Sequence, residues 1–413
     1  MTTSEIITIG TEIILGQITD SNTPYIANIL TEKGIRVQFQ TSVGDDKELL
    51  KSALKVAAER ADLIIITGGL GPTANDVTRE ALSDFFGVSL VLDEESYTHI
   101  QKIVESRHRK VTDADKKQAM VPEGAIVVSN THGTAAGFAF RHGNAEFVCL
   151  PGVPGEMRSM LQTYLETRAT SKAGEDCSLT RTIHTFGISE RAVEDAVGDC
   201  NEQARVMTLV HDGVVSVSIL ATAPTGEGAA KILDAVEQNA RQKLGHAVFG
   251  TGDETLESAV ALLLKKHNKT IAVAESCTGG LVSDKLTNIP GISEFFLEGV
   301  VAYSNRAKSS ILGVPEELIT KHGAVSREVA RAMAEGIQKR SAANVGIGTT
   351  GIAGPGGATK DKPVGLVYVA VVSDGAFEVK ELRLRGARID IKRFSAHCAL
   401  NMARLSLTQV RQP

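Results

Sequence analysis

The chain has 413 residues, of which 42% are apolar and 23% are charged, and its formal net charge is −5. This length is too great for one ordinary core, so we expect about two to four domains of a globular protein. Aromatic residues make up only 4%, Trp is absent and no long basic run occurs, which argues against an aromatic stacking platform or a cationic footprint for nucleic acid.

The N-terminal residues do not have the pattern of a signal peptide, and the cysteines fit a reducing cytoplasm. The chain begins without a positively charged stretch or a long apolar run, and it contains no run of about 18 apolar residues that could span a bilayer. The cysteines are scattered and form no CxxC pair, which argues against a structural zinc site. They are Cys149, Cys177, Cys200, Cys277 and Cys398. We therefore expect a cytoplasmic protein that binds neither membranes nor nucleic acids.

The first part of the chain alternates short β-branched runs with glycine-rich turns and helical stretches. The expected strands, buried in a parallel sheet, cover residues 7–10, 62–69 and 125–130, and the expected helices cover 22–33, 47–60 and 76–86. This alternation predicts a doubly wound α/β domain over residues 1–168.

A small polar stretch at residues 167–178 predicts a linker. The pattern that follows predicts the order strand, helix, strand, strand, helix, strand, with a hairpin at Asp212-Gly213. This order is typical of a small ferredoxin-like module, here over residues 179–250.

A second polar junction, at residues 250–256, begins a third α/β unit over 253–413. The expected helices cover 255–267, 279–288, 306–312, 326–341 and 388–408, and the expected strands cover 270–276, 298–304, 344–350, 365–373 and 377–384.

Ser276 stands where an apolar strand ends and two glycines open a helix. The carboxyl edge of an α/β sheet is where ligands bind, and free N–H groups at a helix start stabilise an oxyanion or a phosphate. A serine becomes a nucleophile when a base takes its proton, and Lys308 with a lowered pKa can do so. Alternatively, Ser276 only caps the helix, or Cys277 is the nucleophile, with His322 or His397 as its base.

Residues 349–357 run from a strand into a loop with four glycines and one proline. Such a loop lets the backbone approach a ligand and present N–H groups to a phosphate, although a plain turn has the same composition.

The N-terminal domain has the same order of strand, glycine-rich loop and helix at residues 62–82. The loop and the helix dipole favour an anion such as a pyrophosphate. Asp76 at the helix start is a candidate ligand for a divalent ion, but Asn75 or Asp76 could equally serve as a helix cap.

Five motifs, in this order and spacing, resemble the C-terminal domain of the CinA family, a family of nicotinamide-nucleotide amidases. They read AESCTGG from residue 274, YSNRAK from 303, HGAVS from 322, GIAGPGG from 351 and KPVG from 362. The resemblance implies hydrolysis of nicotinamide mononucleotide to nicotinic acid mononucleotide and ammonia without a cofactor. It implies Ser276 as nucleophile and Lys308 as base, with Tyr303 in the same site.

The resemblance also implies a set of substrate-binding residues. They are Glu275, Thr278, Gly279, Gly280, Asn305, Gly351, Ile352, Ala353, Gly354 and Arg388. By analogy with other acyl transfers, the N–H groups of Thr278, Gly279 and Gly280 form the oxyanion hole. Arg388 matches a family arginine that pairs with the substrate phosphate. The family usually has Asp before this arginine, whereas this chain has Ala387.

Three further motifs, GTEIILG, TGGLGPT and PGVPGEM, resemble the molybdopterin-binding, MoaB/MogA-like fold of CinA N-terminal domains over about residues 1–168. Some relatives carry ADP-ribose pyrophosphatase activity with a divalent Co or Mg ion. The implied nucleotide site comprises Glu12, Gly68, Gly69, Gly71, Thr73, Asp76, Gly133, Thr134 and Glu156, with Asp76 as the metal ligand. Asn75 replaces a family acid, and the loop GTAAGF lacks a family proline, so this second activity stays open.

The middle module resembles the KH-like domain of CinA proteins, but it lacks a GxxG loop with flanking basic residues. We therefore expect a spacer or a dimer contact, and the resemblance implies a homodimer. The alternative to an enzyme is a non-catalytic nucleotide-sensing or molybdopterin-binding-like regulatory protein.

Overall fold

The computed structural model describes residues 2–169, 177–197 and 204–408, so most of the expected linker at 167–178 lies outside the described residues. Contacts divide the chain into two compact units, each of which includes segments of the middle module. The first is Met1–Thr180 with Ala221–Ile232, and the second is Arg181–Leu220 with Leu233–Pro413. Among the described residues, no helix combines the length and apolar composition that crossing a membrane requires.

The first unit contains a six-stranded sheet with the order β2-β1-β3-β8-β7-β6. The strands are β1 (Thr3–Ile9), β2 (Arg36–Val43), β3 (Leu63–Thr67), β6 (Ile126–Val128), β7 (Gly137–His142) and β8 (Ala145–Leu150). Strand β1 pairs in parallel with β2 on one side and with β3 on the other, and β8 pairs in parallel with β3. The expectation of a buried parallel strand at 125–130 is wrong, because β6 is an edge strand that pairs with β7 antiparallel and leaves Ile126 73% exposed.

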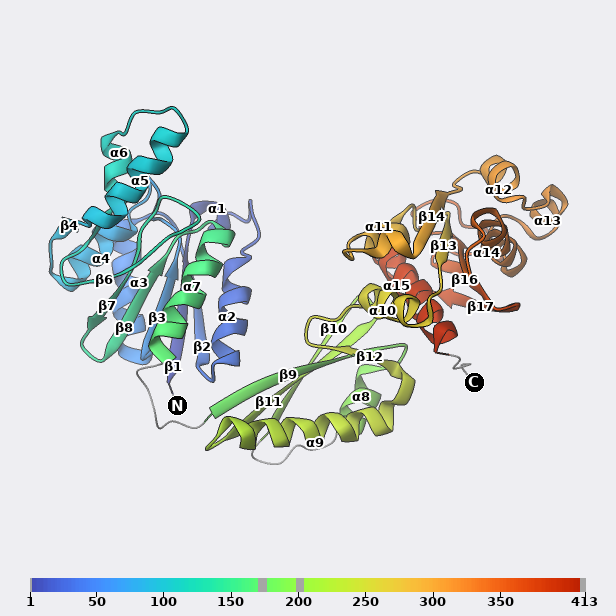
Figure 1. The fold of residues 1–413 in the computed structure, drawn as a ribbon, viewed down its shortest axis with the longest axis horizontal. Coiled ribbons are helices and arrows are strands. Elements are labelled where there is room, and N and C mark those ends of the chain that lie inside the picture. Colours follow the sequence, from blue (N-terminus) through green and yellow to red (C-terminus); the bar gives the residue numbers. More distant parts are fainter. Residues whose placement is uncertain (1, 170–176, 198–203, 409–413) are drawn as a thin grey trace. The chain divides into compact units, whose positions relative to one another are not determined.

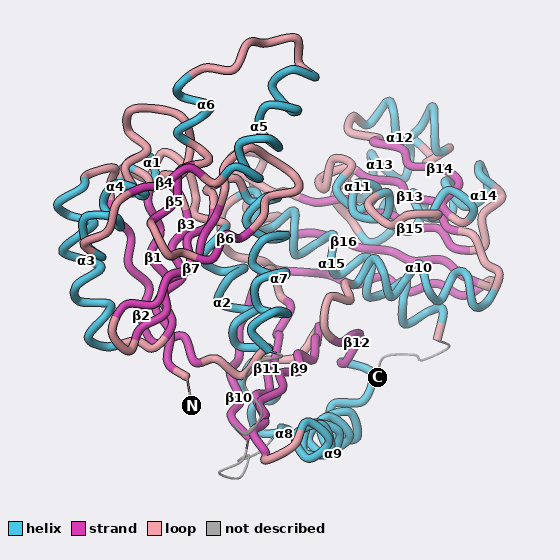
Figure 2. The backbone as a smooth tube through the Cα atoms, turned by 60° about the vertical axis from the view of Figure 1, so that its left-hand side comes forward, coloured by secondary structure: helices cyan, strands magenta, loops and turns pink. Residues whose placement is uncertain are grey.

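Helices cover both faces of this sheet, which confirms the doubly wound fold. They are α2 (Asn22–Glu32) and α7 (Pro154–Ala169) on one face and α3 (Lys47–Arg60) and α4 (Thr78–Phe86) on the other. Figure 2 shows the strands between these two helical layers. Side chains alternate along a strand, so Ile6 packs under one pair of helices and Ile7 under the other.

Several elements of this unit were not expected from the sequence. Besides β2, β7, β8 and α7, they are α1 (Thr11–Ile14), β4 (Leu90–Leu92), α5 (Glu94–Ser106), α6 (Asp113–Lys117) and β5 (Met120–Pro122).

The middle module has the predicted βαββαβ order (Figure 1). Its elements are β9 (Cys177–Phe186), α8 (Glu190–Val197), β10 (Ala204–His211), β11 (Val214–Ala223), α9 (Gly226–Leu244) and β12 (Val248–Thr251), after a 3₁₀ turn at Gly245–Ala247. Its sheet order is β10-β11-β9-β12. The hairpin at Asp212-Gly213 is confirmed, and both residues have a positive φ, of 50° and 81°. A Cβ at position 213 would lie 2.3 Å from the Phe394 ring, so this glycine lets the hairpin tip pack closely.

The C-terminal sheet has the order β14-β13-β15-β16-β17. The strands are β13 (Ile271–Glu275), β14 (Phe296–Val301), β15 (Val345–Gly351), β16 (Leu366–Ser373) and β17 (Ala376–Arg383). Strand β13 pairs in parallel with β14 and β15, and β16 and β17 extend the sheet from β15 by antiparallel pairing. A 3₁₀ turn at Ile292–Glu294 precedes β14.

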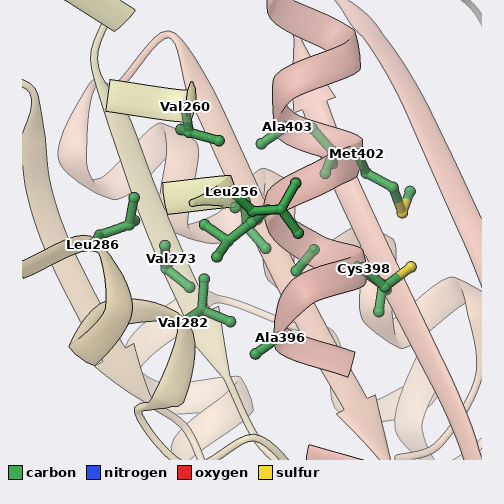
Figure 3. Close-up of a cluster of buried hydrophobic side chains, with 14 of the residues drawn as sticks. Leu256, Val260, Val273, Val282, Leu286, Ala396, Cys398, Met402 and Ala403 are labelled. Atoms are coloured by element: carbon green, nitrogen blue, oxygen red, sulfur yellow. The ribbon is translucent and has the colours of Figure 1, made fainter. Parts of the chain in front are cut away.

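Two helical layers enclose this sheet as well. One layer contains α10 (Leu256–His267), α11 (Leu281–Thr287) and α15 (Arg388–Leu407), and the other contains α12 (Asn305–Leu312), α13 (Glu316–His322) and α14 (Arg327–Ser341). Figure 3 shows Leu256, Val282 and Ala403 of the first layer around Val273 of β13. Because β13, β14 and β15 are parallel, the segments that follow them meet at one edge of the sheet, where ligands of α/β proteins bind.

Candidate active site

Ser276 and Lys308 meet at the carboxyl edge of the C-terminal sheet. Ser276 directly follows β13, and Lys308 lies in α12, one turn after the helix begins. The Nζ atom of Lys308 is 3.0 Å from the Ser276 Oγ atom. Both side chains are buried, with Lys308 only 2% exposed. The structure therefore brings the two predicted residues within proton-transfer distance.

Two backbone carbonyls hold the Lys308 amine. Its Nζ atom donates to the Ala302 oxygen at 3.0 Å and to the Tyr303 oxygen at 3.4 Å. A neutral amine has two N–H groups and one lone pair, so these carbonyls can take both hydrogens and leave the lone pair facing Ser276. Burial disfavours the charged amine and lowers the pKa of Lys308 from its ordinary value.

Glu275 has a structural position in this site. It is fully buried, and its carboxylate accepts hydrogen bonds from the N–H groups of Gly280, Val282 and Ser283 and from the Ser283 hydroxyl. These are the otherwise unpaired donors at the start of α11. The side chain predicted to contact the substrate is thus committed to the helix that follows Ser276, and it has no exposed surface for a ligand.

The turn after Ser276 leaves fewer oxyanion donors than predicted. The Gly279 N–H donates to the Ser276 carbonyl at 3.2 Å, and the Gly280 N–H is used by Glu275. The Thr278 N–H has no backbone partner among the described residues, so it is the predicted donor that we retain. Two glycines remain necessary here because φ is 64° at Gly279 and 96° at Gly280.

Thr349 at the end of β15 is a residue that the sequence analysis missed as a positioning group. Its carbonyl accepts the Ser276 N–H at 2.9 Å, and its hydroxyl lies 2.7 Å from the hydroxyl of the fully buried Thr278. These bonds fix the turn on both sides of Cys277. The apolar pattern around Thr349 predicts only a buried strand. Its positioning role depends on the pairing of β15 with β13, which the local sequence does not contain.

Arg388 connects three parts of the site. Its guanidinium donates to the Gly354 carbonyl at 2.6 Å and to the Tyr303 hydroxyl at 2.9 Å. Tyr303 is 60% exposed and supplies the carbonyl that holds Lys308. The structure thus joins Arg388, Tyr303 and Gly354 to the Ser276–Lys308 pair.

The other predicted residues of this site lie in its loops. Asn305 is exposed at the start of α12. Gly351 ends β15, and the N–H of Ile352 donates to the Leu366 carbonyl at 2.9 Å. Ala353 is buried beside Gly354.

The Cys277 alternative does not fit the geometry. Cys277 is buried, and burial raises the pKa of its thiol to about 12. His397 bonds the Asp212 carbonyl at 3.0 Å, and His322 lies 3.6 Å from a Glu328 carboxylate oxygen. Neither imidazole is held as a base for the thiol.

We expect native Cys277 to resist alkylation by iodoacetamide at pH 8, because a thiol with a pKa near 12 is ionised to only about one part in ten thousand. Peptide mapping after alkylation measures this, and the urea-unfolded chain serves as the control. Rapid labelling of Cys277 in the native protein would restore it as a candidate nucleophile.

The N-terminal domain has a pocket of about 540 Å³ at the corresponding edge of its sheet. All of the predicted residues line it except Gly133, where a Cβ would overlap the Glu156 carboxylate. The lining includes four carboxylates and, among the described residues, no Lys or Arg. They are Glu12, Asp45, Asp76 and Glu156.

The predicted role of Asp76 as a metal ligand does not fit this arrangement. Its carboxylate accepts hydrogen bonds from the Gly71 N–H and from the N–H and hydroxyl of Thr73. No group of three His, Cys, Asp or Glu side chains converges on a metal position in the part of the chain that the structure describes. A cation held by the protein normally takes several such oxygen ligands, so Asp76 is assigned to shaping the loop.

Asn22 lines the same pocket and was missed by the sequence analysis. Its Nδ2 atom donates to the Thr67 hydroxyl at 3.0 Å and to the Gly152 carbonyl at 2.9 Å. The Gly152 carbonyl can only accept, so the orientation of the amide is fixed. The Asn22 Oδ1 atom is then buried without a partner among the residues that the structure describes. This atom is suited to a ligand that presents a hydrogen-bond donor.

Comparison with known proteins supports three family assignments along the chain. Residues 253–407 match "CinA C-terminal domain", residues 5–170 match "Probable molybdopterin binding domain", and residues 180–250 match "Damage-inducible protein CinA KH domain". The solved CinA protein of unknown function from Thermoplasma acidophilum is 33% identical, with a TM-score of 0.38, over 40% of this chain and 97% of its own.

Two relatives match almost the full length. A protein of Caldicellulosiruptor bescii with the provisional name competence-damage inducible protein is 42% identical over 97% of this chain and 98% of its own. A CinA-like protein of Dictyoglomus thermophilum is 41% identical over 98% of both chains. The identity extends along almost the whole length, and the chain contains, in this order, a MoaB/MogA-like domain, a KH-like module and a CinA C-terminal domain. The chain therefore belongs to the CinA family.

Proposed function

We propose that the C-terminal domain hydrolyses the carboxamide of nicotinamide mononucleotide, giving nicotinic acid mononucleotide and ammonia in pyridine-nucleotide salvage. The observation that carries the proposal is the 3.0 Å contact between the buried Lys308 amine and the Ser276 hydroxyl. A protein that only binds a nucleotide does not need a buried lysine with a lowered pKa next to a serine. An enzyme that catalyses acyl transfer needs such a lysine as the base that activates the serine.

In the proposed reaction, the Ser276 Oγ atom attacks the carboxamide carbon while its proton passes to the Lys308 amine. The Thr278 N–H stabilises the oxyanion. The C–N bond then breaks, and the Lys308 ammonium protonates the leaving nitrogen, which departs as ammonia. Water attacks the resulting ester with Lys308 again as the base, and the proton returns to Ser276 as the carboxylic acid leaves.

The proposal is tested by measuring ammonia release from nicotinamide mononucleotide by the purified full chain. We expect the wild type and Cys277→Ala to release ammonia and Ser276→Ala to lose the activity. A silent wild type would favour the non-catalytic, nucleotide-sensing alternative. An active Ser276→Ala together with an inactive Cys277→Ala would refute the mechanism.

For the N-terminal domain we propose nucleotide binding in the pocket that contains Asn22 and Asp76. In the described part of the chain, the pocket lining has four carboxylates and no lysine or arginine, which does not favour a bare pyrophosphate, and its residues do not themselves form a cation site. We therefore derive no pyrophosphatase step. AMP release from ADP-ribose with Co²⁺ or Mg²⁺ would show that the cation arrives with the substrate.

The family resemblance also leads us to propose a homodimer. Sedimentation equilibrium of the full chain measures this, and a mass that stays monomeric at micromolar concentration would contradict it.

A further inference from the structure

Lys392 of α15 lies beside the turn that carries Ser276. Its Nζ atom is 3.5 Å from the position that a Cβ atom would take at Gly279, three residues after Ser276. Lys392 follows Arg388 by four residues, so both side chains lie on one face of the helix. Two cationic side chains of α15 are therefore directed at the same edge of the sheet.

These two cations differ in their partners. The Arg388 guanidinium is already bonded to the Gly354 carbonyl and the Tyr303 hydroxyl. The half-buried Lys392 has no hydrogen bond or ion pair among the described residues. The nearest acid along the helix, Asp390, uses its carboxylate to accept the Ala387 N–H at 2.9 Å. All three N–H donors of Lys392 are thus available to an anion beside this turn, whereas two donors of Arg388 are already in use.

We infer that Lys392 binds the 5′-phosphate of the nucleotide substrate, while Arg388 holds the surrounding loops in place. The inference rests on the proposed amidase function and names a specificity residue for it. Lys308, which contacts Ser276, must be neutral to accept the serine proton, so it cannot also neutralise a phosphate. A free ammonium at the rim of the turn supplies this charge without entering the proton transfer.

Binding to the Ser276→Ala protein tests the inference without turnover. Titration calorimetry would compare nicotinamide mononucleotide with nicotinamide riboside, which lacks only the phosphate. We expect Lys392→Gln to raise the Kd of the mononucleotide by about tenfold and to leave the Kd of the riboside unchanged. Lys392→Arg should restore most of the affinity. The matched control is Lys339→Gln at the exposed C-terminal end of α14, which should change neither value.

Several results would overturn the inference. These are an unchanged Kd for the mononucleotide, an equal loss for both ligands, and no measurable binding of the mononucleotide at millimolar concentration. An equal loss would place Lys392 at the reacting carboxamide instead. A wild type that releases no ammonia, combined with the expected binding pattern, would refute the amidase proposal and leave the phosphate site standing.

Discussion

Replacing Lys308 with methionine is expected to lower kcat for ammonia release by about three to four orders of magnitude, the upper range for the loss of a general base. Methionine fills a similar volume, so the buried position stays packed. It removes the amine that lies 3.0 Å from Ser276 Oγ, together with the bonds to the Ala302 and Tyr303 carbonyls. Steady-state kinetics with nicotinamide mononucleotide measures the loss, and Lys339→Met serves as the control.

The pH dependence of the wild type should identify the same amine. The active form has neutral Lys308, and burial lowers its pKa below the ordinary lysine value of 10.5. We expect kcat/KM to rise with pH and to level off above the Lys308 pKa, with a midpoint below 10.5. In Lys308→Met, the residual rate should lack this rising limb.

Two results would contradict the assignment of Lys308. The first is a methionine variant that keeps a rate close to that of the wild type. The second is a variant whose reduced rate still rises through the same midpoint, which would mean that another group is the base.

The pairing of Ser276 with Lys308 could be predicted because both residues follow strands of one parallel sheet. The carboxyl ends of such strands share an edge, so residues far apart in sequence can meet there. The helices and strands around them were also predictable, because their apolar periodicity is strong. The exposed α13, whose only buried residue is Ile319, lacked such a pattern and was missed.

The roles of Glu275 and Asp76 could not be read from the sequence. An acid beside a glycine-rich turn can face a ligand or accept the backbone N–H groups of its own turn, and composition does not distinguish the two. The structure shows both carboxylates accepting such bonds. The same limit applies to Gly279 and Gly280, whose N–H groups are used within the turn.

The position of β6 was mispredicted for a different reason. Residues 125–130 have the composition of a buried parallel strand, but β7 and β8 form a hairpin that places β7 between β6 and the parallel strands. Strand order depends on pairing between distant segments, which local pattern does not contain.

Replacing Glu275 with glutamine is expected to destabilise the start of α11 by about 3 kcal/mol, although the change removes only a charge and one acceptor atom. Each carboxylate oxygen accepts two hydrogen bonds. Oε2 accepts from the N–H groups of Gly280 and Val282, and Oε1 accepts from the N–H group and the hydroxyl of Ser283. The amide must place its NH₂ group against one of these donor pairs. On the Ser283 side the hydroxyl could rotate to accept from the NH₂ group, but the Ser283 N–H would still face a donor with no solvent to take it.

Hydrogen exchange followed by mass spectrometry measures this effect locally. Peptides that cover Leu281–Thr287 should exchange about a hundredfold faster in Glu275→Gln than in the wild type, while peptides of the N-terminal sheet should not change. The exposed Glu317→Gln is the matched control, because it removes the same charge without breaking a bond. Because Ser276 is the adjacent residue, loosening this turn should also lower kcat. Unchanged exchange in Glu275→Gln would mean that the carboxylate does not hold the helix, and the substrate-binding role first predicted for it would then return.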